Sequence, residues 1–436
     1  MNTIDLNPIL AEVVDATTKG YPLAALPLPL AAIGAQGWRL LDGDLPLPLA
    51  VLRDSALAHN HAWMRDFTAA TGVLLAPHGK TTMAPQIFAQ QLAAGAWGMT
   101  VANVQQLGIC ARLGVRRVLM ANQLLGALEV RTVTGLLRRH PALEFHFLVD
   151  SLAQLDAIEA AAATDPPARK LTALIELGVP GGRTGVRTHD AALALARAVA
   201  ASGVVALSGL ECYEGLQISG DAAKDAQTVG ALMQRVKDLA LACDREGLFA
   251  GPSVILTAGG SAAFDVVARE LPMRLSMPVL TILRSGCYVT HDSGSYERLL
   301  AGIRARSGGE WQTRPGLQPA LEVWSRVQSC PEPGLGILTM GKRDASYDIE
   351  MPIPLKRFRP GSASSAPQGV PAGWTVAAMN DQHAYLRFGA DAEDPPQVGD
   401  LIGAGISHPC TTFDKWRLLF TVDDAYRVTG AIRTFF

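Results

Sequence analysis

The chain has 436 residues, of which 49% are hydrophobic and 18% charged, and its formal net charge is −2. This length suffices for two domains, or for one barrel-sized domain with a smaller companion. The near-neutral charge argues against a nucleic-acid ligand. Residues 1–15 carry acidic residues early and lack a basic region followed by an apolar run, so they predict no secretory signal. The longest apolar stretches, such as 191–201, are too short to span a bilayer. We therefore expect a soluble cytoplasmic protein with no membrane or nucleic-acid partner.

The cysteines are scattered along the sequence and form no C-x-x-C pair. The sequence therefore supports neither a disulfide framework nor a four-cysteine zinc site. We interpret most of them as small buried residues. They are Cys110, Cys212, Cys243, Cys287, Cys330 and Cys410.

Short apolar runs alternate with helical patterns between residues 73 and 283. Eight runs predict strands, at 73–76, 99–102, 118–121, 145–149, 172–177, 207–212, 254–258 and 280–283. Segments with a 3.6-residue apolar period separate them, at 85–94, 104–113, 152–163, 191–201 and 226–245. Near-continuous apolar strands are typical of a parallel sheet covered by helices. Eight such units within about 220 residues favour a (β/α)8 barrel over an open sheet.

The pattern changes after about residue 300, where helical periodicity nearly disappears. Short strand candidates follow at 320–328, 337–340, 374–379, 384–388 and 417–422. The segment 359–373, rich in Pro, Gly, Ser and Ala, predicts an exposed mobile loop. Prolines interrupt the first 45 residues, so we expect an irregular extension there. We predict a barrel over residues 46–295 and a mainly β domain built from 1–45 and 296–436.

Polar residues follow the predicted barrel strands, at the ends where ligands bind in a barrel. A polar rim above an apolar body favours an enzyme that acts on a small molecule. The rim comprises His78, Lys80, Asn122, Gln123, Asp150, Glu176, Arg183, Glu211, Tyr213, Glu214, Thr257, Arg284, Tyr288, His291 and Asp292, together with the turn Gly259, Gly260 and Ser261.

Lys80 and the glycine turn together indicate a cofactor. Lys80 is either a solvated surface charge or an amine whose pKa is lowered for Schiff-base chemistry. Gly259, Gly260 and Ser261 precede a helical stretch at 262–270, so their amides could bind a phosphate. The alternative is a tight turn that requires a positive φ. An amine that faces a phosphate site is what pyridoxal 5′-phosphate requires.

The sequence SHPCT at 407–411 suggests a metal site. If the chain is extended there, as Pro409 favours, His408 and Cys410 point the same way and can chelate one ion. An imidazole and a thiolate suit Zn²⁺ far better than Mg²⁺. The alternative is a hydrogen-bonded histidine beside a buried cysteine.

Six motifs in order along the chain resemble one family. They are PHGKT at 77–81, GGRTGV at 181–186, YEG at 213–215, GGS at 259–261, SGCYVTHD at 285–292 and HPC at 408–410. Together they are similar to the D-serine dehydratase and D-threonine aldolase branch of the alanine racemase-like enzymes, over nearly the whole chain from about Asp44. The resemblance implies a fold-type III pyridoxal phosphate enzyme with a barrel, a C-terminal β domain and a homodimeric assembly.

The resemblance also implies roles for single residues. Lys80 matches the Schiff-base lysine, Arg183 the arginine that faces the cofactor ring, and Tyr213 a tyrosine beside the ring. The phosphate turn and the metal pair of the zinc-carrying dehydratases are matched by Gly259, Gly260, Ser261, His408 and Cys410. Aldolases of the family more often show His-x-Asp with an ion such as manganese, so Cys410 favours a dehydratase.

The chain departs from the family's pattern at two places. Around Lys80 it has Gly79, Thr82 and Met83 where relatives often have other residues. Before Asp292 it has His291 where aromatic residues are common, which changes what the substrate side chain meets. The sequence assigns no role to His78, which either holds the lysine loop or touches the cofactor.

We expect the chain to dehydrate a D-3-hydroxy amino acid, most simply D-serine to pyruvate and ammonia. Lys80 would remove the Cα proton, and a divalent metal, Zn²⁺ by preference, would polarise the β-oxygen. The alternative is retro-aldol cleavage to glycine and an aldehyde. Further alternatives are a non-catalytic pyridoxal phosphate carrier, against which the HPC pair argues, and a barrel enzyme without that cofactor. The sequence leaves open the substrate side chain, whether serine, threonine or 3-hydroxyaspartate, and whether the metal pair serves its own barrel or a partner's.

Overall fold

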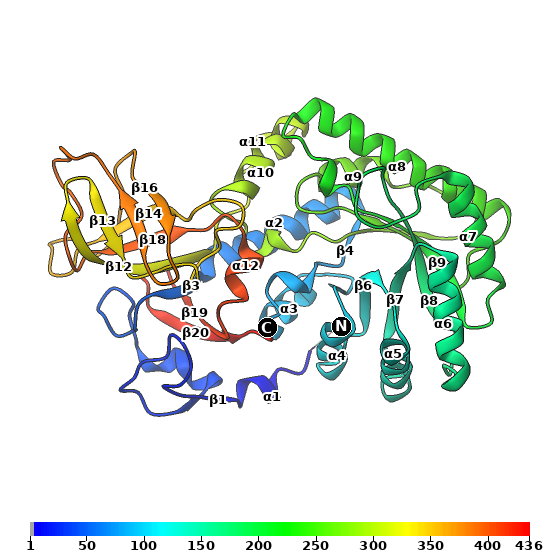
Figure 1. The fold of residues 1–436 in the computed structure, drawn as a ribbon, viewed down its shortest axis with the longest axis horizontal. Coiled ribbons are helices and arrows are strands. Elements are labelled where there is room, and N and C mark those ends of the chain that lie inside the picture. The colour runs from blue at the N-terminus through cyan, green and yellow to red at the C-terminus, as the bar shows by residue number, and fades with distance from the viewer. Residues whose placement is uncertain (1–3) are drawn as a thin grey trace.

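The computed structural model describes residues 4–436, which form a βα barrel beside a mainly β domain (Figure 1). The barrel sheet is parallel throughout, in the order β4-β11-β10-β9-β8-β7-β6-β5. Every strand of this sheet overlaps a run expected from the sequence, so the predicted barrel is confirmed. The strands are β4 (Leu74–Leu75), β5 (Met99–Val101), β6 (Arg117–Gln123), β7 (Glu144–Val149), β8 (Leu171–Leu177), β9 (Val205–Cys212), β10 (Val254–Ala258) and β11 (Val279–Leu283).

Backbone hydrogen bonds close the sheet between its first and last strands. The amide of Trp97 donates to the carbonyl of Leu75 at 2.7 Å, and that of Thr100 to the carbonyl of Pro77 at 2.9 Å. A parallel bridge also joins His78 to Thr100. Buried apolar side chains fill the barrel interior, as a packed barrel core requires. They are Ala76, Leu119, Leu148, Leu174, Ile255 and Ile282.

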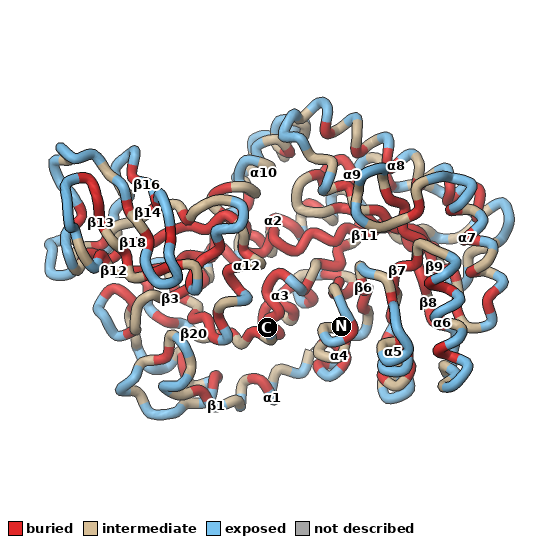
Figure 2. The backbone as a smooth tube through the Cα atoms, in the orientation of Figure 1, coloured by how far each residue is buried: buried red, intermediate tan, exposed pale blue. Residues whose placement is uncertain are grey.

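Helices cover the outside of the barrel, and their exposed faces alternate with buried ones (Figure 2). Several begin at a side chain that accepts a backbone amide, which stabilises a helix start. These caps are Asn103, Ser151, Thr188 and Asp221. The helices are α2 (Asp54–Thr71), α3 (Pro85–Ala93), α4 (Val104–Arg112), α5 (Ala127–Arg139), α6 (Leu152–Thr164), α7 (His189–Ala201), α8 (Ala222–Arg245), α9 (Phe264–Glu270), α10 (Ser295–Arg306) and α11 (Glu310–Thr313). Within residues 4–436, none is long and apolar enough to cross a membrane.

Within residues 4–436, the β domain is one ten-stranded sheet, antiparallel except where β3 pairs with β19. The expected strands are present, whereas β3, β14, β15, β18 and β20 were not predicted as strands. β15 lies in the segment 359–373 that the sequence predicts to be a mobile loop, and it pairs with β14. β18 is rich in glycine, and a Cβ on Gly403 would lie 2.6 Å from the Trp324 ring, so packing selects glycine in a strand there. The strands are β3 (Leu49–Arg53), β12 (Leu321–Glu332), β13 (Leu335–Leu338), β14 (Ile353–Phe358), β15 (Gln368–Gly369), β16 (Thr375–Met379), β17 (Ala384–Arg387), β18 (Leu401–Gly405), β19 (Leu418–Val422) and β20 (Val428–Arg433).

The chain enters the β domain before it enters the barrel. The sequence analysis placed residues from 46 onward in the barrel, but β3 pairs with β12 and β19, and α2 follows it directly. An apolar run does not reveal which sheet it joins. The residues before it form short elements, as an irregular extension should. These are α1 (Asn7–Leu10), β1 (Val13–Val14), β2 (Leu28–Pro29) and the 3₁₀ helix η1 (Leu30–Gln36).

Candidate active site

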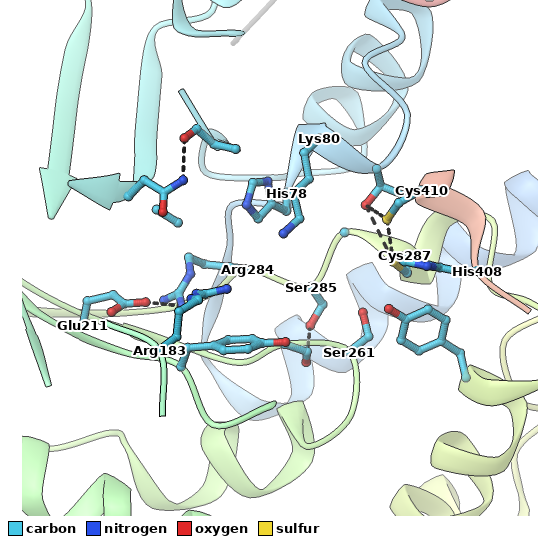
Figure 3. A pocket seen from close by; sticks show the side chains of 18 residues that line it. His78, Lys80, Arg183, Glu211, Ser261, Arg284, Ser285, Cys287, His408 and Cys410 are labelled. Atoms are coloured by element: carbon cyan, nitrogen blue, oxygen red, sulfur yellow. Dashed lines mark hydrogen bonds and ion pairs between the residues drawn. The ribbon is translucent and has the colours of Figure 1, made fainter. Parts of the chain in front are cut away.

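A cavity of about 230 Å³ lies where the carboxyl ends of the barrel strands meet the β domain (Figure 3). Lys80, Arg183, Tyr213, Gly260, Ser261, His408 and Cys410, all expected from the sequence, line this one space, and Gly259 adjoins Gly260. Whether each performs its expected role stays a prediction. The other lining residues are His78, Thr81, Ala102, Ala121, Asn122, Glu211, Arg284, Ser285, Gly286, Cys287 and Tyr296.

Lys80 lies in η2 (Gly79–Thr81), directly after β4, and its amine points into the cavity (Figure 3). Within residues 4–436 the amine has no hydrogen bond or ion pair. Gly79 is required because a Cβ there would lie 2.8 Å from the Phe88 ring. Met83 is buried at a φ of 41°, a conformation that is strained for such a side chain. The unusual residues around Lys80 therefore hold a tight loop that presents a free amine.

His78 lies beside Lys80 and has a buried Nδ1 atom with no hydrogen-bond partner within residues 4–436. Burial lowers its pKa well below the usual value, and the positive charges of Lys80, Arg284 and Arg183 lower it further. Both effects favour the neutral form of the His78 imidazole. Its free nitrogen can accept or donate a hydrogen bond to a bound molecule.

A buried ion pair between Arg284 and Glu211 lies at the base of the cavity. Arg284 also donates to the Thr257 hydroxyl at 3.0 Å and to the carbonyl of Cys212 at 3.1 Å. Burial raises the pKa of Glu211 to about 8, against the opposing effect of Arg284. One carboxylate oxygen of Glu211 has no partner within residues 4–436. The sequence analysis noted both residues on the rim but did not pair them, because strands β9 and β11 bring them together only in the barrel.

Arg183 and Tyr213 line the cavity and contact each other. The guanidinium carbon of Arg183 lies 5.0 Å from the centre of the Tyr213 ring, a cation–π distance. Arg187 holds the loop that carries Arg183 by donating to the carbonyls of Gly182, Thr184 and other loop residues. Arg183 has no carboxylate partner within residues 4–436, so its charge is available to a ligand.

The glycine turn after β10 differs from the expectation. The amides of Gly259 and Gly260 donate to the two carboxylate oxygens of Glu214, at 3.1 and 2.6 Å, rather than being free for a phosphate. The turn is therefore an anion site whose occupant is Glu214, a buried side chain brought there by β9. Gly259 has a φ of 90°, which accounts for the glycine.

A second turn, at 285–287, lies against the first. The Ser285 hydroxyl donates to the carbonyls of Gly259 and Gly260, at 3.0 and 2.9 Å. A Cβ on Gly286 would lie 2.5 Å from the His78 carbonyl oxygen, so only glycine fits. Within residues 4–436 the amides of Ser261, Gly286 and Cys287 have no acceptor. These amides, rather than those held by Glu214, are the donors available to a phosphate group.

The HPC motif begins a helix instead of continuing an extended chain. His408 is extended, with a φ of −152°, but α12 (Pro409–Phe413) starts at the next residue, so Cys410 is helical. The expected extended geometry is wrong because proline is preorganised for the first turn of a helix. Both side chains nevertheless line the cavity. The Nδ1 atom of His408 lies 2.6 Å from the carboxylate of Asp348, and Nε2 has no hydrogen-bond partner among the described residues.

Cys287 lies beside the metal pair, and the sequence analysis assigned it no role. Its sulfur is 3.6 Å from that of Cys410, and the Thr81 hydroxyl lies 3.5 Å from Cys410 and 3.7 Å from Cys287. The hydrogen bond from Cys410 lowers the pKa of Cys287 to about 6, and in return the pKa of Cys410 is raised. Within residues 4–436, no three His, Cys, Asp or Glu side chains already form a group that could hold a metal ion.

Two family models match this sequence. Residues 53–290 match the alanine racemase N-terminal domain, and residues 320–422 match the putative serine dehydratase domain. The first match spans more than half of the chain. The chain belongs to the alanine racemase N-terminal domain family. As the motifs predicted, this member lies in the branch of D-serine dehydratases and D-threonine aldolases, which are fold-type III pyridoxal phosphate enzymes.

Curated relatives of this family member act on D-3-hydroxy amino acids. The D-threonine aldolase of Arthrobacter sp. is 25% identical over 81% of this chain and 82% of its own length. The D-threo-3-hydroxyaspartate dehydratase of Delftia sp. (strain HT23) is 32% identical over 35% of this chain and 39% of its own length. Both names describe lyases, one that cleaves a carbon–carbon bond and one that removes water.

Solved structures share the fold of this family member. The D-threonine aldolase of Filomicrobium marinum is 24% identical with a TM-score of 0.73, and the match covers 91% of this chain and 97% of that one. A metal-free form of a D-threo-3-hydroxyaspartate dehydratase, in which a cysteine is replaced by alanine, is 22% identical with a TM-score of 0.70, over 91% and 99% of the two chains. Barrel and β domain are therefore arranged as in both kinds of lyase.

Proposed function

We propose that this protein is a pyridoxal phosphate-dependent, metal-assisted lyase that dehydrates a D-3-hydroxy amino acid, as D-serine dehydratases do. One observation carries the proposal: the unpaired amine of Lys80 shares a cavity with His408 and Cys410. The relatives, which act on D-3-hydroxy amino acids, support the substrate class.

The cavity residues fit the cofactor. Lys80 supplies the amine. The amides of Ser261, Gly286 and Cys287, which have no acceptor within residues 4–436, would hold the phosphate. The Nδ1 atom of His78, which has no partner there, could bond to a polar atom of the cofactor. When bound, the cofactor supplies a carbonyl for Lys80 and an electron sink for the charge that develops at the substrate Cα. Glycine at 286 keeps the space that a Cβ would fill.

Different residues of the chain would transfer the proton and orient the substrate. Lys80 would take the proton from the substrate Cα, since its amine is free and points into the cavity. The guanidinium of Arg284, held by Glu211, and that of Arg183, which lies over the Tyr213 ring, would orient an anionic group.

His408 and Cys410 fit a divalent metal of the zinc type. Asp348 fixes the imidazole by its Nδ1 atom, which is a common way to orient a metal-binding histidine. A metal held there would act as a Lewis acid on the substrate hydroxyl, a poor leaving group otherwise. A thiolate ligand favours zinc over magnesium or manganese.

Aldol cleavage is the second candidate, and the names of the aldolase relatives favour it. The two reactions share the amine, the cofactor and the metal, and differ in the bond that breaks at Cβ. Purified protein loaded with cofactor and Zn²⁺ should be given D-serine, D-threonine and D-threo-3-hydroxyaspartate separately. A 2-oxo acid with ammonia supports dehydration, and glycine with an aldehyde supports cleavage.

Borohydride trapping tests the cofactor itself. Reduction of the loaded protein should attach a pyridoxyl group to Lys80, located by peptide mass spectrometry. Lys80→Ala should abolish the adduct, whereas Lys224→Ala, which changes an exposed lysine on α8, should not. No adduct on the wild-type protein would overturn the proposal, and a non-catalytic carrier would trap cofactor but release no product.

A homodimer in the cytoplasm remains part of the proposal. Exposed leucines lie after β6 and at the starts of α5 and α6: Leu125 is 54% exposed, Leu128 71% and Leu152 53%. Exposed large apolar side chains of this kind are what a surface covered by a second protein would carry. Sedimentation velocity should give twice the mass of one chain, and a monomer would contradict this part.

A further inference from the structure

We propose that Cys287 is a third protein ligand for the divalent metal, beside His408 and Cys410. This inference rests on the proposed function, because it concerns the same ion. It goes further in assigning to the metal a cysteine from the barrel, whereas the HPC pair belongs to the β domain.

The separation of the two sulfurs carries the argument. The sulfurs of Cys287 and Cys410 lie 3.6 Å apart. Two thiolates at about 2.3 Å from a tetrahedral zinc ion are separated by about 3.8 Å. The pair therefore already stands at nearly the spacing that a shared ion requires. A disulfide needs a sulfur–sulfur distance of about 2.05 Å, so the two cysteines are not joined.

The surroundings of Cys287 hold its sulfur toward the β domain. Cys287 begins η4 (Cys287–Val289) and is 6% exposed. The Thr81 hydroxyl lies within hydrogen-bonding reach of both sulfurs, at 3.5 and 3.7 Å, and so ties the thiol pair to the loop of Lys80. A metal bound by these sulfurs would then lie next to the loop that carries Lys80.

His408, which lines the same cavity, would complete the donor set. As the side chains stand, no three such groups within residues 4–436 are arranged to hold an ion, so the imidazole would have to approach the thiol pair. Its Nδ1 is held by Asp348, and Nε2 remains for the metal. Two cysteines and one histidine with an open fourth position are a known catalytic zinc arrangement. The open position would receive the substrate hydroxyl.

Metal binding measured without turnover tests the proposal. Zn²⁺ affinity would be measured by competition with a chromophoric chelator for the wild type and for Cys287→Ala, Cys287→Ser, Cys410→Ala and His408→Ala. Cys330→Ala is the matched control, since Cys330 in β12 is exposed and does not line the cavity. Co²⁺ would replace Zn²⁺ in a second series, because its sulfur-to-metal absorption reports the number of bound thiolates.

We expect Cys287→Ala and Cys287→Ser to weaken Zn²⁺ binding by roughly tenfold or more, by analogy with other losses at metal sites. Each should also remove about half of the sulfur-to-cobalt absorption, since one of the two proposed thiolates is lost. Cys330→Ala should change neither quantity. Borohydride trapping on Lys80 should remain in the Cys287 variants, which shows that they are folded.

The outcomes separate this inference from the proposed function. If the Cys287 variants keep wild-type affinity and cobalt absorption while Cys410→Ala and His408→Ala lose both, the third ligand is overturned and the HPC site stands. If none of the four variants changes zinc binding, the metal site of the proposed function fails, and this inference fails with it.

Discussion

The barrel and the β domain contribute to the same cavity in different ways. Barrel residues such as Lys80 and Arg284 follow strands, so their order in the sequence already assigns them to one rim. His408 precedes α12 and Cys410 lies in its first turn, and only domain packing brings them to that rim. The difference suggests a division of labour in which the barrel would hold the cofactor and the β domain would select the reaction.

The largest expected loss of activity comes from removing the amine of Lys80, which the barrel contributes. Lys80→Ala should lower kcat/KM by at least about 10³-fold, because the proton acceptor at Cα is lost. Steady-state kinetics with the preferred D-3-hydroxy amino acid measure this, with Lys224→Ala as the control. Activity within tenfold of the wild type would refute the role of Lys80.

Loss of the metal site on the β domain should stop the reaction but leave the cofactor bound. Chelation, or His408→Ala, should lower turnover by about 10²-fold or more, since the hydroxyl leaves poorly without a Lewis acid. Added Zn²⁺ should restore the chelated wild type but not the variant. Loss of borohydride trapping on Lys80 in either sample would contradict the division of labour.

The opposite end of the barrel should affect stability but not chemistry. His146 in β7 bonds to the Ser208 hydroxyl at 2.9 Å, and burial lowers its pKa from 6.5 to about 4. Below pH 6.5 the unfolded chain binds a proton at His146 and the folded chain does not, so stability falls as the pH falls toward 4. The full loss is about 3 kcal/mol.

Urea unfolding at pH 7 and pH 4.5 measures most of this loss, and His146→Asn should reduce the difference between the unfolding free energies at the two pH values. A wild type and a variant with the same pH dependence would show that His146 does not contribute. Titration of other groups is shared by both proteins and so cancels in the comparison.

The smallest expected effect concerns the packing of the β domain. Gly403→Ala would place a Cβ 2.6 Å from the Trp324 ring, which should cost about 1–3 kcal/mol. Gly369→Ala is the matched control, since a Cβ at this exposed strand position meets nothing within 4 Å. Chemical denaturation compares the two, and equal stabilities would show that β18 can shift to accept the side chain.

Much of the fold could be predicted because the barrel repeats a local pattern. Each barrel strand contains a mainly apolar run and is followed by polar residues, so Lys80, Arg183 and Tyr213 could be placed on the rim. In the β domain, strands were missed where side-chain packing outweighs the strand propensity of the residues. β18 contains two glycines, and β14 contains Pro354 at an irregular position, so neither is typical of a strand.

The candidate site shows the same limit. Glu214 could be placed on the rim, but not against Gly259 and Gly260, because that contact joins different strands. Cys287 was indistinguishable from a buried small residue until its sulfur was found 3.6 Å from that of Cys410.

The sequence alone determined the barrel, the family and most of the residues that surround the cavity, because apolar periodicity and ordered motifs are local properties of the chain. The tertiary structure decided which amides are free for a phosphate, that Cys410 is helical, and that a second cysteine lies beside it. These features depend on contacts between residues far apart in the chain, such as Cys287 and Cys410, and no local pattern records such contacts.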